Sequence, residues 1–372
     1  MRRLFRFSLA AALAVLAASP TFPAPAQPSL SGVWDGTVGD KPVRVCFDQR
    51  EWGGLGAYYY LSHLRSIPLQ SPQGQKHTFV EGYDEKDTTS PRWVIERLTP
   101  QEIGGSWSQG GRILALHLAR VSTPRGDTEG TSCSSMAFNA ARLQGVRTIR
   151  RAATKDGVAY TRLILDHRGH FGDDVGIETF ALIGDTPPVR RINAELGKPL
   201  QSEDWFECVR SALDANGFDG DSSETLEPRM ITRRWLSVMD ESGWYCGGAH
   251  PDDSVLPRLF DRETGREIDL HQWLNAKAVT RTDELIALRP ELRNLILRRH
   301  KTDSECTDTV NEENYWTIEL TRTGLIFTPS LPHVAVGCRD EYLVPFPKLR
   351  PYLRPEAQRE IAALEAEIAS RR

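Results

Sequence analysis

Short segments of alternating apolar and polar residues fill the chain between residues 29 and 147. Aromatic and β-branched residues are frequent in them, and turns of Gly, Pro and Ser separate them. Many short strands at regular spacing are typical of an antiparallel barrel or sandwich, so we predict an all-β domain over 29–147. The predicted strands are 32–36, 42–47, 57–60, 78–81, 93–97, 105–107 and 113–118. Trp34 belongs to the first of them, and its side chain either fills the barrel interior as a plug or lines a ligand-binding cavity.

In the region 150–353, segments with the apolar period of a helix are interspersed with segments that have the period of a strand. This mixture predicts an α+β domain with an antiparallel sheet. Residues 142–155 are basic and weakly patterned, and we expect a linker there. We predict strands at 158–166, 177–183, 230–239, 315–320, 325–328 and 342–344. We predict helices at 187–196, at 205–213 and along the leucine stripe of 285–295, where Pro290 can begin a second helix. Gly217 is expected to end the second of these helices. The segment 354–372 is predicted as a C-terminal amphipathic helix with Ile361, Leu364 and Ile368 on one side.

The stretch 244–274 carries the most distinctive local pattern. Gly247 and Gly248 can adopt positive φ, so the chain can fold back after Cys246. His250 precedes Pro251, which restricts His250 to extended geometry. Residues 261–265 form a predicted turn that ends in glycine, and 267–270 return as a partner strand. We therefore expect a stiff histidine-bearing bend followed by a hairpin.

The first 26 residues have the pattern of a secretory signal peptide. Arg2, Arg3 and Arg6 precede an apolar run over 7–18, and an Ala-Pro-Ala site ends at Ala26. The apolar run is shorter than the roughly 20 residues that span a bilayer, so we expect cleavage rather than stable membrane insertion. The predicted location is periplasmic or secreted.

Composition narrows the class of partner and the chemistry of the cysteines. The chain has 40% hydrophobic and 26% charged residues, and loss of three leader arginines changes its formal net charge from −4 to −7. This acidity argues against a nucleic-acid partner. The six cysteines show no CxxC or zinc-like spacing and fit an oxidising compartment. Fifteen connectivities exist for six cysteines. We predict the sequential one, which joins Cys46 to Cys133, Cys208 to Cys246 and Cys306 to Cys338.

Two ordered blocks carry a family resemblance. The first contains Gly-Gly-Ala-His-Pro at 247–251 and Phe-Asp-x-x-Thr-Gly-x-x-Ile-x-Leu at 260–270; the second covers 315–327, 336–338 and 342–349. Over about residues 150–353 the chain resembles the extracytoplasmic domain of unknown function shared by the anti-sigma factor RsiV and the peptidoglycan deacetylase PdaC. The resemblance implies a binding domain of the cell envelope, with lysozyme or peptidoglycan as the ligand.

Departures from these two proteins limit what the resemblance implies. We expect a cleavable signal at the start of the chain instead of a cytosolic segment, and we expect no deacetylase domain beyond residue 372. Neither sigma-factor regulation nor deacetylation is therefore expected. The resemblance leaves the N-terminal region 29–147 without a counterpart.

The candidate ligand-binding residues all belong to the bend. They are Gly247, Gly248, Ala249, His250, Asp252 and Asp253. We predict no catalytic residue, no metal and no cofactor, because the sequence contains no Gly-x-Ser-x-Gly, HExxH, P-loop or Rossmann motif. Two alternatives stay open: a cell-wall hydrolase or metal-dependent enzyme that uses His250, and a carrier of a small hydrophobic ligand in the N-terminal barrel. The close pair His167 and His170 is interpreted as part of a surface loop.

Overall fold

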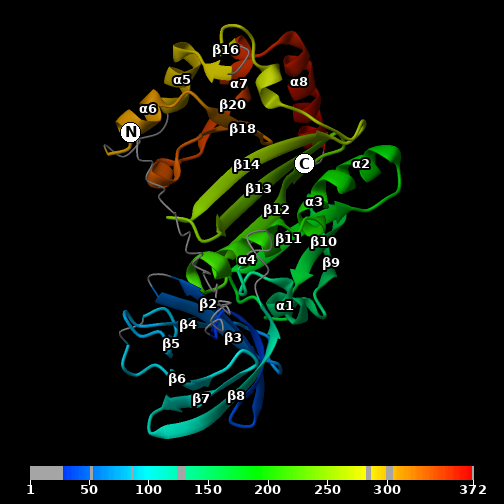
Figure 1. The fold of residues 1–372 in the computed structure, drawn as a ribbon. Coiled ribbons are helices and arrows are strands. Elements are labelled where there is room, and N and C mark those ends of the chain that lie inside the picture. Colours follow the sequence, from blue (N-terminus) through cyan, green and yellow to red (C-terminus); the bar gives the residue numbers. More distant parts are fainter. Residues whose placement is uncertain are drawn as a thin grey trace, which may run out of the picture.

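The computed structural model describes residues 28–50, 53–84, 87–123, 131–281, 286–298 and 305–370. The predicted signal peptide, residues 1–26, lies outside this part of the chain. None of the helices in the described part is long and apolar enough to cross a membrane. The chain forms an α+β structure with three parts in sequence order: an N-terminal barrel, a central sheet and a C-terminal lobe (Figure 1).

The N-terminal part is a closed barrel of eight antiparallel strands in sequential order. Strand β1 pairs with both β2 and β8, which closes the barrel and removes its edges. The strands are β1 (Gly32–Val38), β2 (Lys41–Arg50), β3 (Gly53–Tyr60), β4 (Ile67–Gln70), β5 (Thr78–Glu81), β6 (Arg92–Leu98), β7 (Glu102–Gln109) and β8 (Arg112–Ser122). Strand β4 was not predicted, because it has four residues and contains Pro68.

Aromatic side chains fill the barrel. Trp34 is fully buried among them, and its Nε1 donates to the carbonyl of Leu30, so it acts as a plug. Deeper in the barrel, one oxygen of Glu81 accepts from Tyr58 Oη at 2.8 Å and from Trp93 Nε1 at 2.9 Å. Trp107 Nε1 donates to the same oxygen at 2.7 Å. This carboxylate satisfies three polar groups that the aromatic packing would otherwise bury without partners.

A seven-stranded sheet follows, in the order β15-β14-β13-β12-β11-β10-β9. All its pairs are antiparallel except β11 with β12. Its strands are β9 (Arg147–Lys155), β10 (Val158–Asp166), β11 (Val175–Leu182), β12 (Asp221–Ile231), β13 (Trp235–Tyr245), β14 (Asp252–Asp261) and β15 (Arg266–Glu267). As predicted, the turn before β15 has Gly265 at positive φ, here +73°.

Two predictions about this sheet are wrong. Residues 147–155 are not a linker but the edge strand β9, which lacks an apolar alternation because it is largely exposed. Residues 230–239 do not form one strand, because the chain turns between β12 and β13 at 232–234. The Thr232 hydroxyl and backbone close that turn with bonds to Trp235. Thr232 is a β-branched polar residue between two apolar runs, and such a residue alone does not predict a turn.

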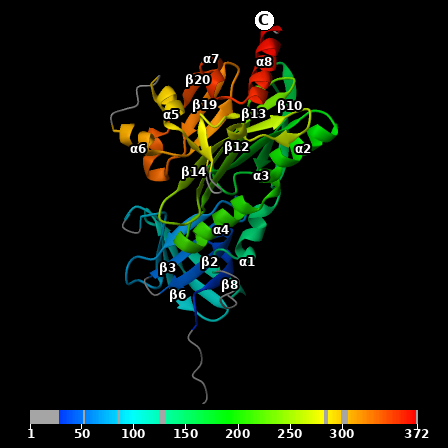
Figure 2. The same ribbon diagram turned by 90° about the horizontal axis from the view of Figure 1, so that it is seen from above.

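Three helices connect the parallel strands β11 and β12, since a parallel pair requires a crossover. They are α2 (Pro187–Leu196), α3 (Lys198–Gln201) and α4 (Asp204–Asn216). Helix α4 ends at Gly217, whose φ of +78° is the left-handed C-cap that the sequence predicts. In both ribbon views α4 lies between the barrel and the sheet (Figures 1 and 2).

The C-terminal lobe packs its own core against the far side of the sheet, where Trp235 and Leu259 join it. Helix α8 contributes Ile361 and Leu364 to this core, so the predicted amphipathic tail packs on the lobe. Residues 286–288 form a strand and not the predicted helix, while Leu285 lies outside the described residues; Pro290 begins the helix, as expected. The elements are β16 (Val279–Arg281), β17 (Ile286–Leu288), α5 (Pro290–Leu297), α6 (Thr307–Glu312), β18 (Trp316–Leu320), β19 (Gly324–Pro329), β20 (Tyr342–Pro345), α7 (Phe346–Leu349) and α8 (Pro355–Ser370), with 3-10 helices η3 (Leu270–Trp273), η4 (His333–Cys338) and η5 (Arg350–Tyr352).

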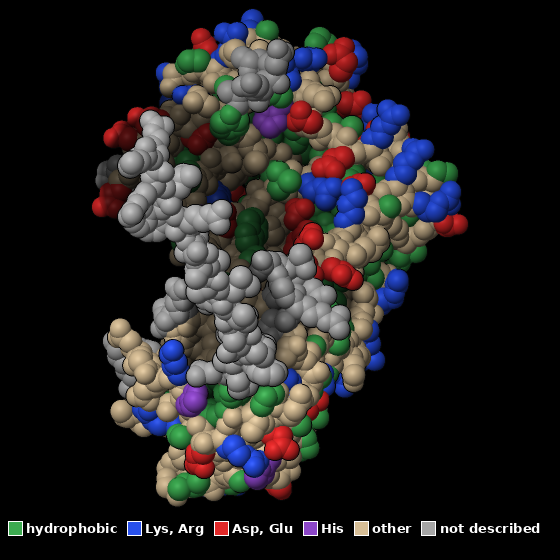
Figure 3. Space-filling model, in the orientation of Figure 1, with side chains coloured by type: hydrophobic (Ala, Val, Ile, Leu, Met, Phe, Trp, Pro, Cys, Tyr) green, Lys and Arg blue, Asp and Glu red, His purple; other side chains and the backbone are tan. Residues whose placement is uncertain are grey.

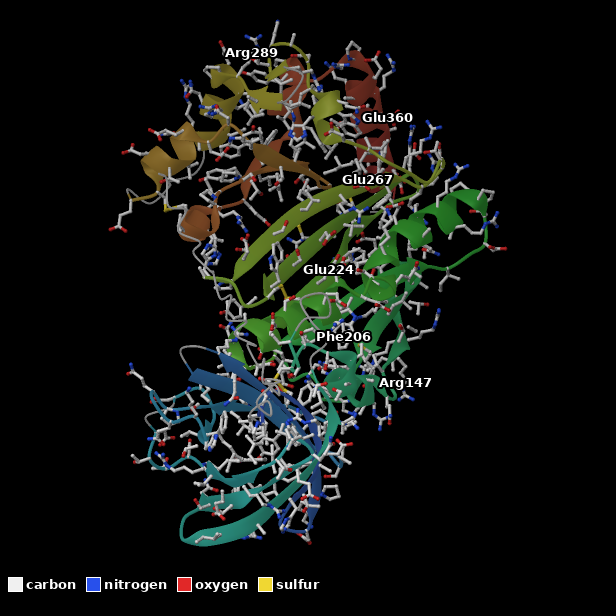
Figure 4. The ribbon with its side chains drawn as sticks, viewed as in Figure 1. Arg147, Phe206, Glu224, Glu267, Arg289 and Glu360 are labelled. Carbon is white, nitrogen blue, oxygen red and sulfur yellow. A yellow bond between two sulfur atoms is a disulfide. The ribbon has the colours of Figure 1, made fainter. Side chains whose placement is uncertain are left out.

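The barrel and the sheet share a hydrophobic core. The outward positions of β1–β3, such as Val33 and Ala57, pack with Phe206 and Val209 of α4. Figure 4 shows Phe206 on the side of α4 that is nearest to the barrel. Strands β1–β3 are therefore buried on both faces, one toward the barrel interior and one toward α4.

Arg142 belongs to the 3-10 helix η2 (Ala140–Leu143) and lies fully buried at this junction of barrel and sheet. Its guanidinium makes a bidentate pair with Asp219, at 2.8 Å and 2.5 Å. Its remaining N–H groups donate to the carbonyls of Leu64 and His170 and to the amide oxygen of Asn139. These partners belong to the barrel, to α1 (Met136–Asn139) and to loops of the sheet region, so one side chain connects all of them.

Three disulfides are present, Cys46–Cys133, Cys208–Cys246 and Cys306–Cys338, in the sequential order that we predict. The first ties β2 to the segment before α1. The second ties α4 to the end of β13, and the third ties the residue before α6 to the end of η4.

We expect Arg142→Met to lower the free energy of unfolding by about 3–5 kcal/mol, because it leaves Asp219 and three other acceptors without their donor. Denaturant unfolding of the chain without its predicted signal peptide measures this loss. Arg147→Met is the matched control: Arg147 is largely exposed beside Asp166, and we expect a loss below about 1 kcal/mol. Equal losses in the two variants would show that the Arg142 cluster does not stabilise the junction.

Candidate functional site

A groove opens on one face of the central sheet, between α3 and α4 on one side and strands β12, β13 and β14 on the other. Its volume is about 360 Å³. Figure 3 shows the surface hollowed between the C-terminal lobe and the helices, with acidic side chains around the hollow. Pockets of this size with a few converging polar groups are the usual places for ligand binding.

The strand register determines which side chains reach the groove. Successive residues of a strand point to opposite faces, so alternate positions share one face. Glu224 lies opposite Ser242, and Ser242 lies opposite Ser254. In the neighbouring row, Trp244 lies opposite Ser222. These five side chains all line the groove. The row of Glu224, Ser242 and Ser254 presents a carboxylate and two hydroxyls, and the row of Trp244 and Ser222 presents an indole and a hydroxyl.

The groove is acidic. Asp204, Glu224 and Asp240 line it, and none of the lining residues that the structure describes is a lysine or an arginine. Burial raises the pKa of Glu224, and the nearby Asp240 raises it further. Burial also raises the pKa of Asp240, although Arg258 opposes the shift from 3.7 Å away. Arg258 is engaged elsewhere, in a two-bond pair with Glu267 at 2.9 Å and 2.7 Å.

Within the described residues, the side chain of Glu224 has no hydrogen bond or ion pair. In Figure 4, Glu224 lies next to α4, and Glu267 lies farther along the sheet toward the C-terminal lobe. Arg258, the basic partner of Glu267, lowers the pKa of Glu224, but less than burial and Asp240 raise it.

Two apolar side chains border the acidic part of the groove. Trp244 is 39% exposed and Leu256 is 48% exposed, which is high for residues of this size. Trp244 lines the groove from β13, and Leu256 lines it from β14. An exposed aromatic beside carboxylates offers apolar contact and a π face for a cation in the same site.

The predicted bend follows directly after the groove, because Trp244 and Cys246 line the groove and Gly247 comes next. Gly247 has φ +93°, and a Cβ there would lie 2.6 Å from Ala215 of α4, so glycine is required. Gly248 does not adopt positive φ and faces open space, contrary to our expectation for it. Ala249 is exposed, as is most of the bend.

His250 and the two aspartates meet a segment that the sequence analysis did not select. The exposed His250 ring stacks on His333 of η4, with centroids 5.6 Å apart and planes 3° apart. Asp253 accepts from Arg339 at 2.5 Å and lies 3.3 Å from His333 Nδ1. The Arg339 hydrogen bond, helped by His333, holds the pKa of Asp253 below its ordinary value. Asp252 is exposed beside them.

Chemically, this cluster offers ligands but no assembled reaction centre. Asp252, Asp253 and His333 each present a ligand atom, and these atoms lie within 4.8 Å of one another. His250 Nδ1 donates to the carbonyl of Pro251 at 2.9 Å, which fixes the ring on its own backbone.

The other histidine pair is structural. His167 Nε2 donates to the carbonyl of Val175 at 2.8 Å, and His170 Nδ1 donates to the carbonyl of Arg142 at 2.7 Å. One ring nitrogen of each histidine is thus occupied by backbone, and His170 belongs to the Arg142 cluster.

We predict that Glu224→Gln raises the melting temperature at pH 7.5. A raised pKa means that folded protein binds the proton more tightly than unfolded protein, so stability falls as pH rises through the interval between the two pKa values. The amide removes this cost, and the difference from wild type should vanish toward about pH 3, where glutamate is largely protonated in both states. Calorimetric melting over this pH range tests it, with Glu241→Gln on the opposite face of β13 as a control without effect. A lower melting temperature for Glu224→Gln at pH 7.5 would contradict it.

Among the solved structures that are similar to this chain are two DUF3298 family proteins. One, from Pseudomonas aeruginosa PAO1, has 16% identity and a TM-score of 0.36, and covers 58% of this chain and 97% of its own. The other, from Bacteroides fragilis NCTC 9343, has 12% identity and a TM-score of 0.39, and covers 59% of this chain and 96% of its own. No family model and no curated protein matches the chain. Neither structure is of RsiV or PdaC, so that resemblance stays a prediction.

Proposed function

We propose that this chain is an exported binding protein of the cell envelope and that it takes its ligand in the groove between α4 and β12–β14. Lysozyme and peptidoglycan are the candidate ligands. Three disulfides and no free cysteine in the described chain fit an extracellular or periplasmic protein. The predicted signal peptide is consistent with this location.

The observation that carries the proposal is the charge of the groove. Three carboxylates line it without a lysine or arginine among the described lining residues, and Glu224 has no ion-pair partner there. Such a surface attracts a basic protein and accelerates its association. Lysozyme of the c-type is basic, which makes it the first candidate. The hydroxyl groups of a glycan can also donate to these carboxylates, so peptidoglycan is the second candidate.

The bend has a supporting role in this proposal. Gly247 packs on α4, and the disulfide Cys208–Cys246 holds the same helix to the end of β13. The Gly247–Asp253 segment therefore forms a fixed rim at one end of the groove. A rigid rim lowers the entropic cost of binding.

A cell-wall hydrolase is the second candidate function, and the groove supports it better than His250 does. A carboxyl group with a raised pKa next to a second carboxylate is the pairing that acid–base catalysis uses, and Glu224 and Asp240 have it. This candidate requires turnover of muropeptides that Glu224→Gln abolishes. The binding proposal requires no turnover in either protein. Carriage of a small hydrophobic ligand has less support, because Trp34 and the other aromatics fill the barrel.

Calorimetric titration of the exported chain with c-type lysozyme and with muropeptides tests the binding proposal. We expect micromolar or tighter binding of one of them, and weakening by at least about tenfold, or 1.4 kcal/mol, in the Glu224→Gln/Asp240→Asn variant. For lysozyme, association should slow as salt rises. Glu241→Gln, from the other face of β13, should bind like wild type. No heat with any ligand up to about 100 µM, a limit of roughly −5.5 kcal/mol, would refute the proposal.

A further inference from the structure

The bend after β13 and the 3-10 helix η4 bring metal-ligating side chains together from segments about eighty residues apart. His333 Nδ1 lies 3.3 Å from Asp253 Oδ1. Asp252 completes a set of three whose ligand atoms are all within 4.8 Å of one another. The His250 ring stacks on His333. The proposed groove function uses the bend only as a rim and assigns no role to the side chains of Asp252, Asp253 and His333.

Covalent bonds hold both halves of the set in place. Cys246 lies just before the bend and is bonded to Cys208 of α4. Cys338 is the last residue of η4 and is bonded to Cys306. The strand partner of Asp253 is Gly243, so β13 also holds the aspartate pair in register. Ligands on elements fixed in this way need little reorganisation when an ion binds.

A neighbouring arginine orients one carboxylate of the set. Arg339 donates to Asp253 Oδ2 at 2.5 Å, which leaves Oδ1 directed toward His333. Outer hydrogen bonds of this kind orient the ligands in known metal sites.

We propose that Asp252, Asp253 and His333 bind one divalent transition-metal ion of the zinc type, with the remaining coordination position open to solvent. Imidazole nitrogen together with carboxylate oxygen is a donor set that zinc and its neighbours accept in tetrahedral geometry. Ligand atoms around one zinc ion lie about 3.4 Å apart, so the set closes by small side-chain rotations. Asp252 and His250 are exposed, and the ion can enter from solvent.

Such an ion would connect β14 to the C-terminal lobe. Asp252 and Asp253 are the first residues of β14, and His333 begins η4 in the lobe. Asp252 is also the register partner of Trp244, which lines the groove. Metal binding would therefore order the bend at the end of the groove, in addition to stabilising the fold.

The test is titration of the exported chain, purified without a histidine tag, with Zn²⁺ by calorimetry, together with its melting temperature with and without Zn²⁺. We expect one ion per chain, micromolar affinity and a higher melting temperature with metal. Asp252→Asn and His333→Ala should each weaken binding by about tenfold or more and remove the thermal shift. His63→Ala changes an exposed histidine of the barrel and should bind like wild type.

Asp252→Asn keeps the test decisive if His333→Ala disturbs the fold. Asp252 is exposed, and within the described residues its carboxylate accepts only from the neighbouring Asp253 amide. Binding that is absent at about 100 µM Zn²⁺, or that Asp252→Asn leaves unchanged, would overturn the proposal. Lysozyme and muropeptide titrations without metal report on the groove separately, so the two proposals fail independently.

Discussion

The buried pair of Arg142 and Asp219 is the contact on which the arrangement of this molecule depends. A guanidinium out of water is tolerated only when its donors are satisfied, and here every N–H finds an acceptor. Those acceptors come from a barrel loop, from α1, from the loop before β11 and from the segment that follows α4. The barrel is thereby fixed against α4, and α4 forms one wall of the groove. The disulfide Cys46–Cys133, which closes a loop of 87 residues, supports the same junction.

Much of the fold is predictable from local pattern. Seven of the barrel strands, the helix that ends at Gly217, the hairpin turn at Gly265 and the sequential disulfides all follow from alternation, glycine geometry and order along the chain. Two of the failures, at β9 and at the start of β12, share one cause. Strand β9 is an exposed edge and β12 starts with Asp-Ser-Ser-Glu, so neither shows an apolar alternation. Their pairing with neighbouring strands, which the local sequence does not encode, makes them strands.

The candidate site was predictable only in part. The bend was found because glycine allows a sharp turn there and Pro251 restricts the residue before it. Glu224 and Asp240 were missed, because their acidity resembles that of any solvated segment until β12 and β13 pair and turn both residues toward α4. Residues 222–225 and 240–242 are continuously polar, so no alternation marked the groove. His333 and Arg339 were missed for a different reason: they lie about eighty residues from the bend, and only the tertiary fold brings them to Asp253.

Hydrogen–deuterium exchange with and without the envelope ligand tests most directly the claim that the α4-facing side of the sheet is a receptor surface. The account predicts that saturating lysozyme or muropeptide slows exchange in 222–226, 240–246 and 252–256, while the barrel strands β5–β7 are unchanged. Slower exchange confined to the barrel, or none in the three groove segments under saturating ligand, would contradict it.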